Sequence, residues 1–128
     1  MTWKGHPKVA TLVTLGTPHI SFERWTRSSL DFVNNNYPGA FYKNVNYVCV
    51  AGKTIFGKRK LGNWLANNSY KQTCGEGNTW GDGITPIKAA HLEGATNLVI
   101  ENVKHSPRSP KPWYGSQQSL SIWSEFIA

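Results

Sequence analysis

Two residue types that can together activate a nucleophile stand in separate loops of this 128-residue sequence. Asp82 lies between Gly81 and Gly83, just before a helix signal, and His105 follows the next apolar run. A histidine acts as a general base when a carboxylate holds one ring nitrogen and the other nitrogen faces the nucleophile. An aspartate between glycines is also a common turn residue. The pair predicts an orienting acid, Asp82, and a general base, His105.

The nucleophile that such a pair would activate has no counterpart in the sequence. No serine stands in a Gly-x-Ser-x-Gly context, which places a nucleophile on a tight turn between a strand and a helix. Residues 115–119 come nearest, but they lack the second glycine and follow a loop instead of a strand. The sequence therefore predicts two of the three members of a hydrolytic triad.

Three residues at the end of the first apolar run, Thr17, Pro18 and His19, are candidates for lining a substrate pocket. The sequence has no HExxH, CxxC or GxGxxG pattern, so we expect no metal and no cofactor. Cys49 lies in an apolar run and Cys74 in a glycine-rich loop. A disulfide between them is possible, but nothing else indicates an oxidising compartment, which favours free thiols.

The charge of the chain favours anionic partners. Fourteen Lys and Arg against seven Asp and Glu give a net charge of +7, which attracts phospholipid surfaces at long range. The basic residues are scattered apart from residues 58–60 (Lys-Arg-Lys), a run typical of a solvated loop. We expect no nucleic acid partner, because no basic stripe interleaved with aromatic residues occurs. We find neither a signal peptide nor a run of the roughly 20 apolar residues that a membrane helix requires.

Alternating elements must position these residues. The patterns predict strands at 9–15, 45–51 and 97–103, helices at 22–33, 86–95 and 116–128, an irregular excursion or flap at 53–80, and a loop at 106–115. Such alternation indicates an α/β fold with a mainly parallel sheet of about three strands and flanking helices. Ligands of these sheets bind at the carboxyl ends of the strands. Residues 16–19, Gly52, Asp82 and His105 would converge at that end.

Five segments resemble lipase-type α/β-hydrolases. Residues 12–19 (Leu-Val-Thr-Leu-Gly-Thr-Pro-His) resemble the signature of the sixth strand of that family. Residues 81–86 resemble the loop that carries the catalytic acid, and residues 104–106 resemble the segment with the catalytic histidine. Residues 47–52 and 90–95 resemble the plant and cyanobacterial lipase-like branch related to GPI inositol-deacylases.

The resemblance covers the C-terminal half of that fold. It implies that residues 1–128 form one partial α/β-hydrolase domain in which Asp82 is the orienting acid and His105 the base. The family's nucleophilic serine and oxyanion donors precede the sixth strand. The implied activity is serine-dependent hydrolysis of a carboxylic ester, with a lipid acyl ester favoured over other small esters, in a plastid or another intracellular compartment.

Three interpretations follow from these observations. The favoured one is a fragment or shortened form of an ester hydrolase that is inactive alone, because triad members act as a unit. The second is a non-catalytic hydrolase-like module whose basic surface binds anionic lipid or a protein partner. The third is an unrelated basic domain associated with nucleic acid. In the first two cases the first strand keeps an open edge, which predicts aggregation or a need for a partner.

Overall fold

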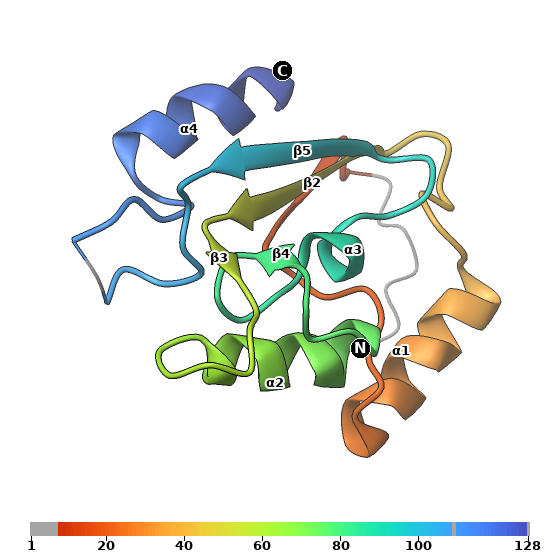
Figure 1. Ribbon diagram of the computed structural model, residues 1–128. Coiled ribbons are helices and arrows are strands. Elements are labelled where there is room, and N and C mark those ends of the chain that lie inside the picture. Colours follow the sequence, from red (N-terminus) through yellow and green to blue (C-terminus); the bar gives the residue numbers. More distant parts are fainter. Residues whose placement is uncertain (1–7, 109, 128) are drawn as a thin grey trace.

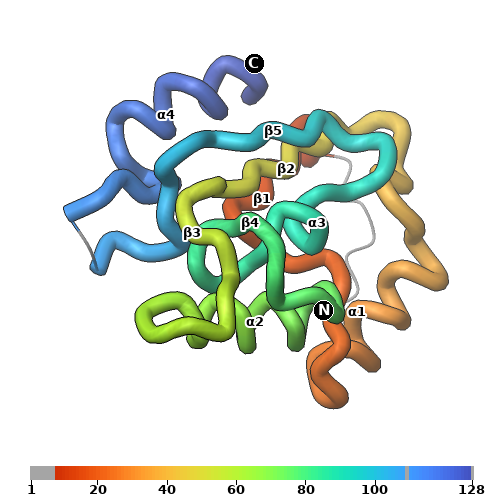
Figure 2. The backbone as a smooth tube through the Cα atoms, viewed as in Figure 1, coloured from red at the N-terminus to blue at the C-terminus, as the bar shows by residue number. Residues whose placement is uncertain are grey.

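A parallel sheet of three strands forms the centre of the computed structural model, which describes residues 8–108 and 110–127 (Figure 1). The strands are β1 (Thr11–Leu15), β2 (Asn46–Lys53) and β5 (Thr96–Glu101), in the order β1-β2-β5. Figure 2 shows them side by side, and both pairs are parallel. Residues 48–52 of β2 are buried consecutively, as expected for a strand covered on both faces. The predicted α/β architecture with a short parallel sheet is confirmed.

Helices cover the two faces of the sheet. On one face, α4 (Gln117–Trp123) and the 3-10 helix η1 (Ser124–Phe126) contribute Trp123 and Phe126 to the core. The buried residues of this core are Val48, Val50, Ile100, Val103 and Tyr114. On the other side, α3 (Ile87–Ala90) packs against β2, and its Ala89 and Ala90 are buried (Figure 1).

The helix α1 (Arg24–Asn36) provides the crossover that parallel neighbours require between β1 and β2. It begins at a side-chain cap, because the Glu23 carboxylate accepts hydrogen bonds from the backbone N–H groups of Trp25 and Thr26. No residue of α1 is buried, and Trp25 is 80% exposed. The crossover was predicted at residues 22–33.

The prediction of an irregular excursion at residues 53–80 was wrong. This segment contains β3 (Ile55–Phe56), α2 (Trp64–Cys74) and β4 (Trp80–Gly81), and β3 pairs antiparallel with β4. The helix α2 gave a weak apolar pattern because its buried residues are Ala66, Asn67 and Tyr70. A left-handed Gly75 (φ 79°) ends it.

The bounds of the later elements also differ from the predictions. The helix predicted at 86–95 is reduced to the four residues of α3, since the chain continues extended from His91 (φ −88°, ψ 148°). Leu92 then forms two hydrogen bonds with the Asn97 side chain, which lead the chain into β5. β5 ends at Glu101, not at residue 103, and the helical pattern predicted at 116–128 divides into α4 and η1; residue 128 lies outside the described residues.

The strand β1 forms one edge of the sheet. Within residues 8–108 and 110–127 it pairs only with β2, and β5 forms the opposite edge. Leu12 on β1 and Phe22 just before α1 are 37% and 59% exposed. The same part of the chain contains no helix long and apolar enough to cross a membrane.

Candidate active site

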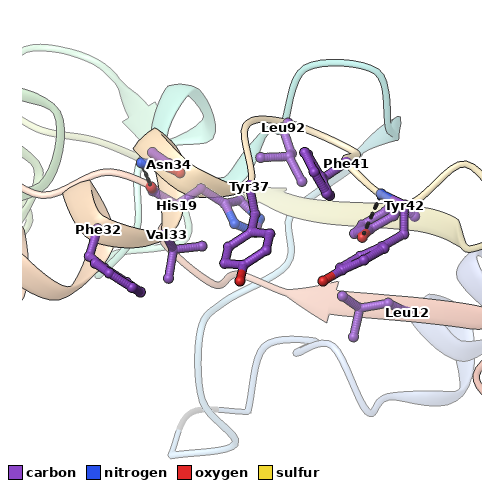
Figure 3. Close-up of a pocket in the computed structure, with 11 residues that line it drawn as sticks. Leu12, His19, Phe32, Val33, Asn34, Tyr37, Phe41, Tyr42 and Leu92 are labelled. Carbon is purple, nitrogen blue, oxygen red and sulfur yellow. Dashed lines mark hydrogen bonds between the residues drawn. The ribbon is translucent and has the colours of Figure 1, made fainter. Parts of the chain in front are cut away.

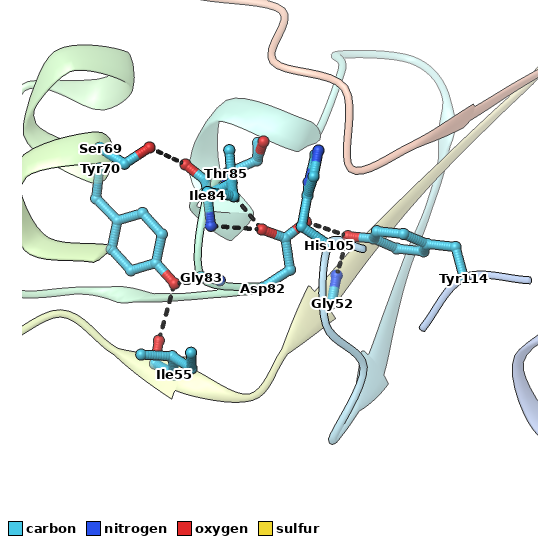
Figure 4. Close-up of polar contacts among 10 residues, drawn as sticks. All are labelled: Gly52, Ile55, Ser69, Tyr70, Asp82, Gly83, Ile84, Thr85, His105 and Tyr114. Carbon is cyan, nitrogen blue, oxygen red and sulfur yellow. Dashed lines mark hydrogen bonds and ion pairs between the residues drawn. The ribbon is translucent and has the colours of Figure 1, made fainter. Parts of the chain in front are cut away.

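Asp82 lies in a tight turn between β4 and α3. Its carboxylate oxygen Oδ1 accepts hydrogen bonds from the backbone N–H groups of Ile84 (2.9 Å) and Thr85 (2.7 Å) (Figure 4). This side-chain bonding closes the turn in the manner typical of aspartate. Gly83 adopts φ 102°, a conformation that favours glycine. The sequence predicted this sharp turn, but the carboxylate is enclosed, with 0% of the side chain exposed.

His105 contacts the second oxygen of the same carboxylate. Its ring nitrogen Nδ1 lies 2.9 Å from Oδ2 of Asp82, and its backbone N–H donates to the Asp82 carbonyl oxygen at 3.1 Å. The backbone bond and the ring bond together fix the imidazole against the Asp82 turn. The structure thus brings together the two residues that the sequence singled out.

Asp82 determines which ring nitrogen of His105 carries the proton. A carboxylate that accepts four hydrogen bonds can only accept, so Nδ1 is the donor and Nε2 of the neutral ring is left as an acceptor. The hydrogen bond to Asp82 raises the pKa of His105, and partial burial opposes this effect. The imidazole side chain is 35% exposed, and the far end of its ring points away from the carboxylate (Figure 4). The arrangement suits a base whose free nitrogen faces outward.

Tyr114 completes the hydrogen bonds of the Asp82 carboxylate. Its hydroxyl donates to Oδ2 at 2.6 Å and accepts from the backbone N–H of Gly52 at 2.8 Å (Figure 4). Burial, followed by the nearby Asp82 charge, raises the pKa of the Tyr114 phenol, so it stays protonated as a donor. Nothing in the sequence predicts this residue, which precedes α4 in a segment expected to be loop.

Two glycines at strand ends make room for this cluster. A Cβ atom at Gly16 would lie 2.6 Å from both Asp82 Oδ2 and the Tyr114 hydroxyl, and at Gly52 it would lie 2.4 Å from the Val103 carbonyl oxygen. Both distances are shorter than van der Waals contact, so neither position has room for a side chain. Of the residues predicted to converge at the carboxyl ends of the strands, Gly16, Gly52, Asp82 and His105 therefore lie together, whereas Thr17 and His19 of the predicted segment 16–19 do not line the groove beside His105.

The helix α2 supports the Asp82 turn from the other side. The buried Tyr70 hydroxyl accepts from the Gly83 N–H at 2.8 Å and donates to the Ile55 carbonyl oxygen at 3.1 Å. Ser69 donates to the Ile84 carbonyl oxygen at 2.5 Å. The segment predicted to be irregular thus positions the acid, and the sequence missed both residues because α2 itself was missed.

A groove of about 270 Å³ runs beside His105. It is lined by Pro18, Ser21, Glu23, Thr26, Ser69, Gln72, Thr73, Ile84, Thr85 and His105. Of the three predicted pocket residues, Pro18 therefore lies next to the candidate base. Thr17 is exposed and lines neither this groove nor the cavity at His19.

His19 faces a separate cavity of about 210 Å³ between β1, α1 and the chain that follows α1 (Figure 3). The cavity is lined by Leu12, His19, Phe32, Val33, Asn34, Tyr37, Gly39, Phe41, Tyr42, Tyr47 and Leu92. The His19 nitrogen Nε2 lies 3.4 Å from Thr14 Oγ1 and 3.5 Å from Cys49 Sγ. Burial, and secondarily the nearby His91, lowers the pKa of His19. His19 is thus separated from the Asp82 and His105 pair.

No nucleophile among the described residues is hydrogen-bonded to His105, although the hydroxyl groups of Ser21, Ser69 and Thr73 line the groove beside it. Within residues 8–108 and 110–127, Asp82 is the only side chain hydrogen-bonded to its ring. Both cysteines are free; Cys49 is buried, and burial raises the pKa of its thiol, which disfavours the reactive thiolate. Over the same residues, no three His, Cys, Asp or Glu side chains form a group that could hold a metal ion.

Comparison with known proteins gave no relative: no family model, no curated protein and no solved structure matches this chain.

Proposed function

We propose that Asp82 and His105 are the orienting acid and the general base of a serine-dependent hydrolase of carboxylic esters, with a lipid acyl ester as the favoured substrate. The observation that carries the proposal is the 2.9 Å contact between His105 Nδ1 and the fully enclosed Asp82 carboxylate. The raised pKa of His105 supports it, because a carboxylate that stabilises the imidazolium strengthens the base.

The proposed reaction follows from the free nitrogen of His105. Nε2 takes the proton of a serine hydroxyl as its oxygen attacks the ester carbonyl carbon, and the imidazolium then returns that proton to the departing alkoxide. The products of this half-reaction are an alcohol and an acyl-serine. Water attacks the acyl group by the same route, which releases the acid and regenerates the serine. Asp82 holds Nδ1–H throughout both half-reactions.

The serine and the oxyanion donors of this proposal come from outside the described residues, so the present chain alone would be inactive. The open edge of β1 supports this part of the proposal, because a further strand or a partner protein can pair with it. β1 also leads directly into Gly16, whose position adjoins Asp82. A nucleophile delivered along this edge would arrive beside the candidate acid.

Whether the His105 ring nitrogen is accessible and able to accept a proton can be tested on the chain alone. Diethyl pyrocarbonate acylates unprotonated imidazole nitrogens, and peptide mass spectrometry identifies the histidine that reacts. We expect His105 to react increasingly as the pH rises, with a midpoint that Asp82→Asn lowers and that His91→Gln leaves unchanged. A His105 ring that stays unmodified at all pH values would contradict its role as a base.

The need for an external nucleophile has its own test. The wild-type chain and His105→Ala should hydrolyse a nitrophenyl butyrate ester at the same background rate. Turnover that requires His105 would show that the chain supplies its own nucleophile, and this part of the proposal would then be wrong.

A further inference from the structure

Residues 58–65 combine adjacent cations with exposed apolar side chains, and we call them the tip segment. The loop before α2 connects this helix to β3 and projects beyond the first turn of the helix (Figures 1 and 2), and Trp64 and Leu65 are the first two residues of α2. Lys, Arg and Lys at residues 58–60 are all exposed. Leu61 is 102% exposed, Trp64 52% and Leu65 66%. Single exposed apolar residues are common on protein surfaces, but three within residues 61–65 form a patch that calls for a partner.

The cations of the tip segment are available to an outside anion. None of the ion pairs among the described residues involves residues 58–60. Arg59 lines a further groove, whose one acidic lining residue is Glu76. Glu76 is already paired with Lys88 at 2.6 Å. Lys58 Nζ lies 5.8 Å from the centroid of the Phe56 ring, which leaves its charge unneutralised.

We propose that the tip segment docks the chain on the surface of an anionic phospholipid bilayer. Leu61 and Leu65 would enter the boundary between headgroups and acyl chains, where burial of apolar surface is favourable. Trp64 has the amphipathic ring that prefers this interface. Residues 58–60 would contact the anionic headgroups.

The exposed leucines favour a bilayer over a nucleic acid. A nucleic acid strand would use the cations and stack a base on Trp64, but it would leave Leu61 in water. A bilayer contacts the cations, the Trp64 ring and the leucines at the same time. Lipid binding through this segment therefore explains its composition more completely.

The tip segment and the His105 groove share the helix α2. The segment continues into α2, whose Ser69 and Thr73 line that groove. Trp64 and Ser69 lie about 8 Å apart along the helix axis, from the rise of an α-helix per residue. The inference does not depend on ester hydrolysis, since the docking surface is complete in this chain.

Co-sedimentation with vesicles tests the proposal. The full chain is incubated with vesicles of phosphatidylcholine, or of an equal mixture of phosphatidylcholine and phosphatidylserine, at increasing salt. We expect salt-sensitive binding to the mixed vesicles only. Lys58→Gln, Arg59→Gln and Lys60→Gln together should lower the partition coefficient on the order of 100-fold. Leu61→Gln with Leu65→Gln should lower it about tenfold or more, from the lost apolar burial.

A charge-matched control separates the tip segment from net charge. Arg24→Gln, Arg27→Gln and Lys43→Gln together remove three exposed cations elsewhere, and this triple variant should lose far less binding than the tip variant. An equal loss in both triple variants would overturn the proposal, and so would wild-type binding by the double leucine variant. Duplex DNA binding that exceeds vesicle binding would also overturn it. The assay requires no nucleophile, so its outcome is distinct from that of the ester assay.

Discussion

The hydroxyl of Tyr114 donates a 2.6 Å hydrogen bond to Oδ2 of Asp82, the oxygen that also contacts His105. Tyr114 and His105 thus both form a hydrogen bond with the same carboxylate oxygen of Asp82. The Tyr114 bond fixes the position of the carboxylate, and it withdraws part of the negative charge that would otherwise stabilise a protonated His105. Tyr114 is therefore a positioning residue that also sets the basicity of the candidate base.

Replacement of Tyr114 by Phe should destabilise the fold and raise the pKa of His105. The change removes a donor to Asp82 and leaves the N–H of Gly52, a buried residue, without its acceptor, which costs about 1–3 kcal/mol. It also leaves Oδ2 to His105 alone, which favours the imidazolium. Denaturant unfolding measures the first effect and an NMR titration of His105 measures the second.

Tyr47→Phe is the matched control for this substitution. The Tyr47 hydroxyl accepts a long hydrogen bond, 3.4 Å from the Tyr42 N–H, in a half-buried position. Its loss should cost less than that of the Tyr114 hydroxyl and should not change the His105 titration. Equal destabilisation by both variants would argue against the role assigned to Tyr114.

Gly16→Ala should damage the candidate site more than Gly62→Ala. Both glycines adopt a positive φ, 59° and 96°, so both substitutions strain the backbone. Only at Gly16 would the new methyl group also collide with Asp82 and Tyr114, whereas nothing lies within 4 Å at Gly62. The collision should add about 1–3 kcal/mol to the loss of unfolding free energy. Thermal and denaturant unfolding of the two variants check this, and similar losses would contradict the packing described.

His105 and His19 should titrate on opposite sides of the ordinary histidine pKa of 6.5. The Asp82 hydrogen bond raises the pKa of His105, and burial lowers that of His19. NMR titration of the ring protons, assigned with His105→Gln and His19→Gln, measures both. Asp82→Asn should lower the His105 midpoint and leave the His19 midpoint in place. A His105 midpoint at or below 6.5 in the wild type would refute the ion pair.

The pKa shifts of His105 and His19 determine how the contribution of each histidine to the free energy of unfolding changes with pH. The stabilisation from His105 is complete below pH 6.5, its ordinary pKa, and is lost as the pH rises through its raised folded pKa. The contribution of His19 has the opposite sign. Its pKa is lowered by burial, so the unfolded chain takes up a proton before the folded protein does, and the fold loses stability as the pH falls from 6.5 through the lowered pKa. Comparing wild type with each His→Gln variant over this range separates the two contributions.

The sheet and the position of the acid and base were accessible from the sequence, because strong local patterns encode them. Three short apolar runs, two of them closed by glycine, predicted three parallel strands, and parallel strands bring residues at their carboxyl ends together. The supports of the site were not accessible. Tyr70 belongs to a helix whose buried face is partly polar, and Tyr114 acts across 32 residues of chain on Asp82. Contacts of this kind depend on the tertiary fold and leave no periodic signal.

The enclosure of Asp82 ties distant parts of the chain together. Its hydrogen bonds reach His105 and Tyr114 across 23 and 32 residues, and the bond from Gly52 to Tyr114 spans 62 residues. Each of these contacts closes a loop of chain, and non-local contacts of this kind slow folding. A segment that ends after β2 contains Gly16 and Gly52 but neither the acid nor the base. The candidate site therefore requires the chain to fold as far as Tyr114.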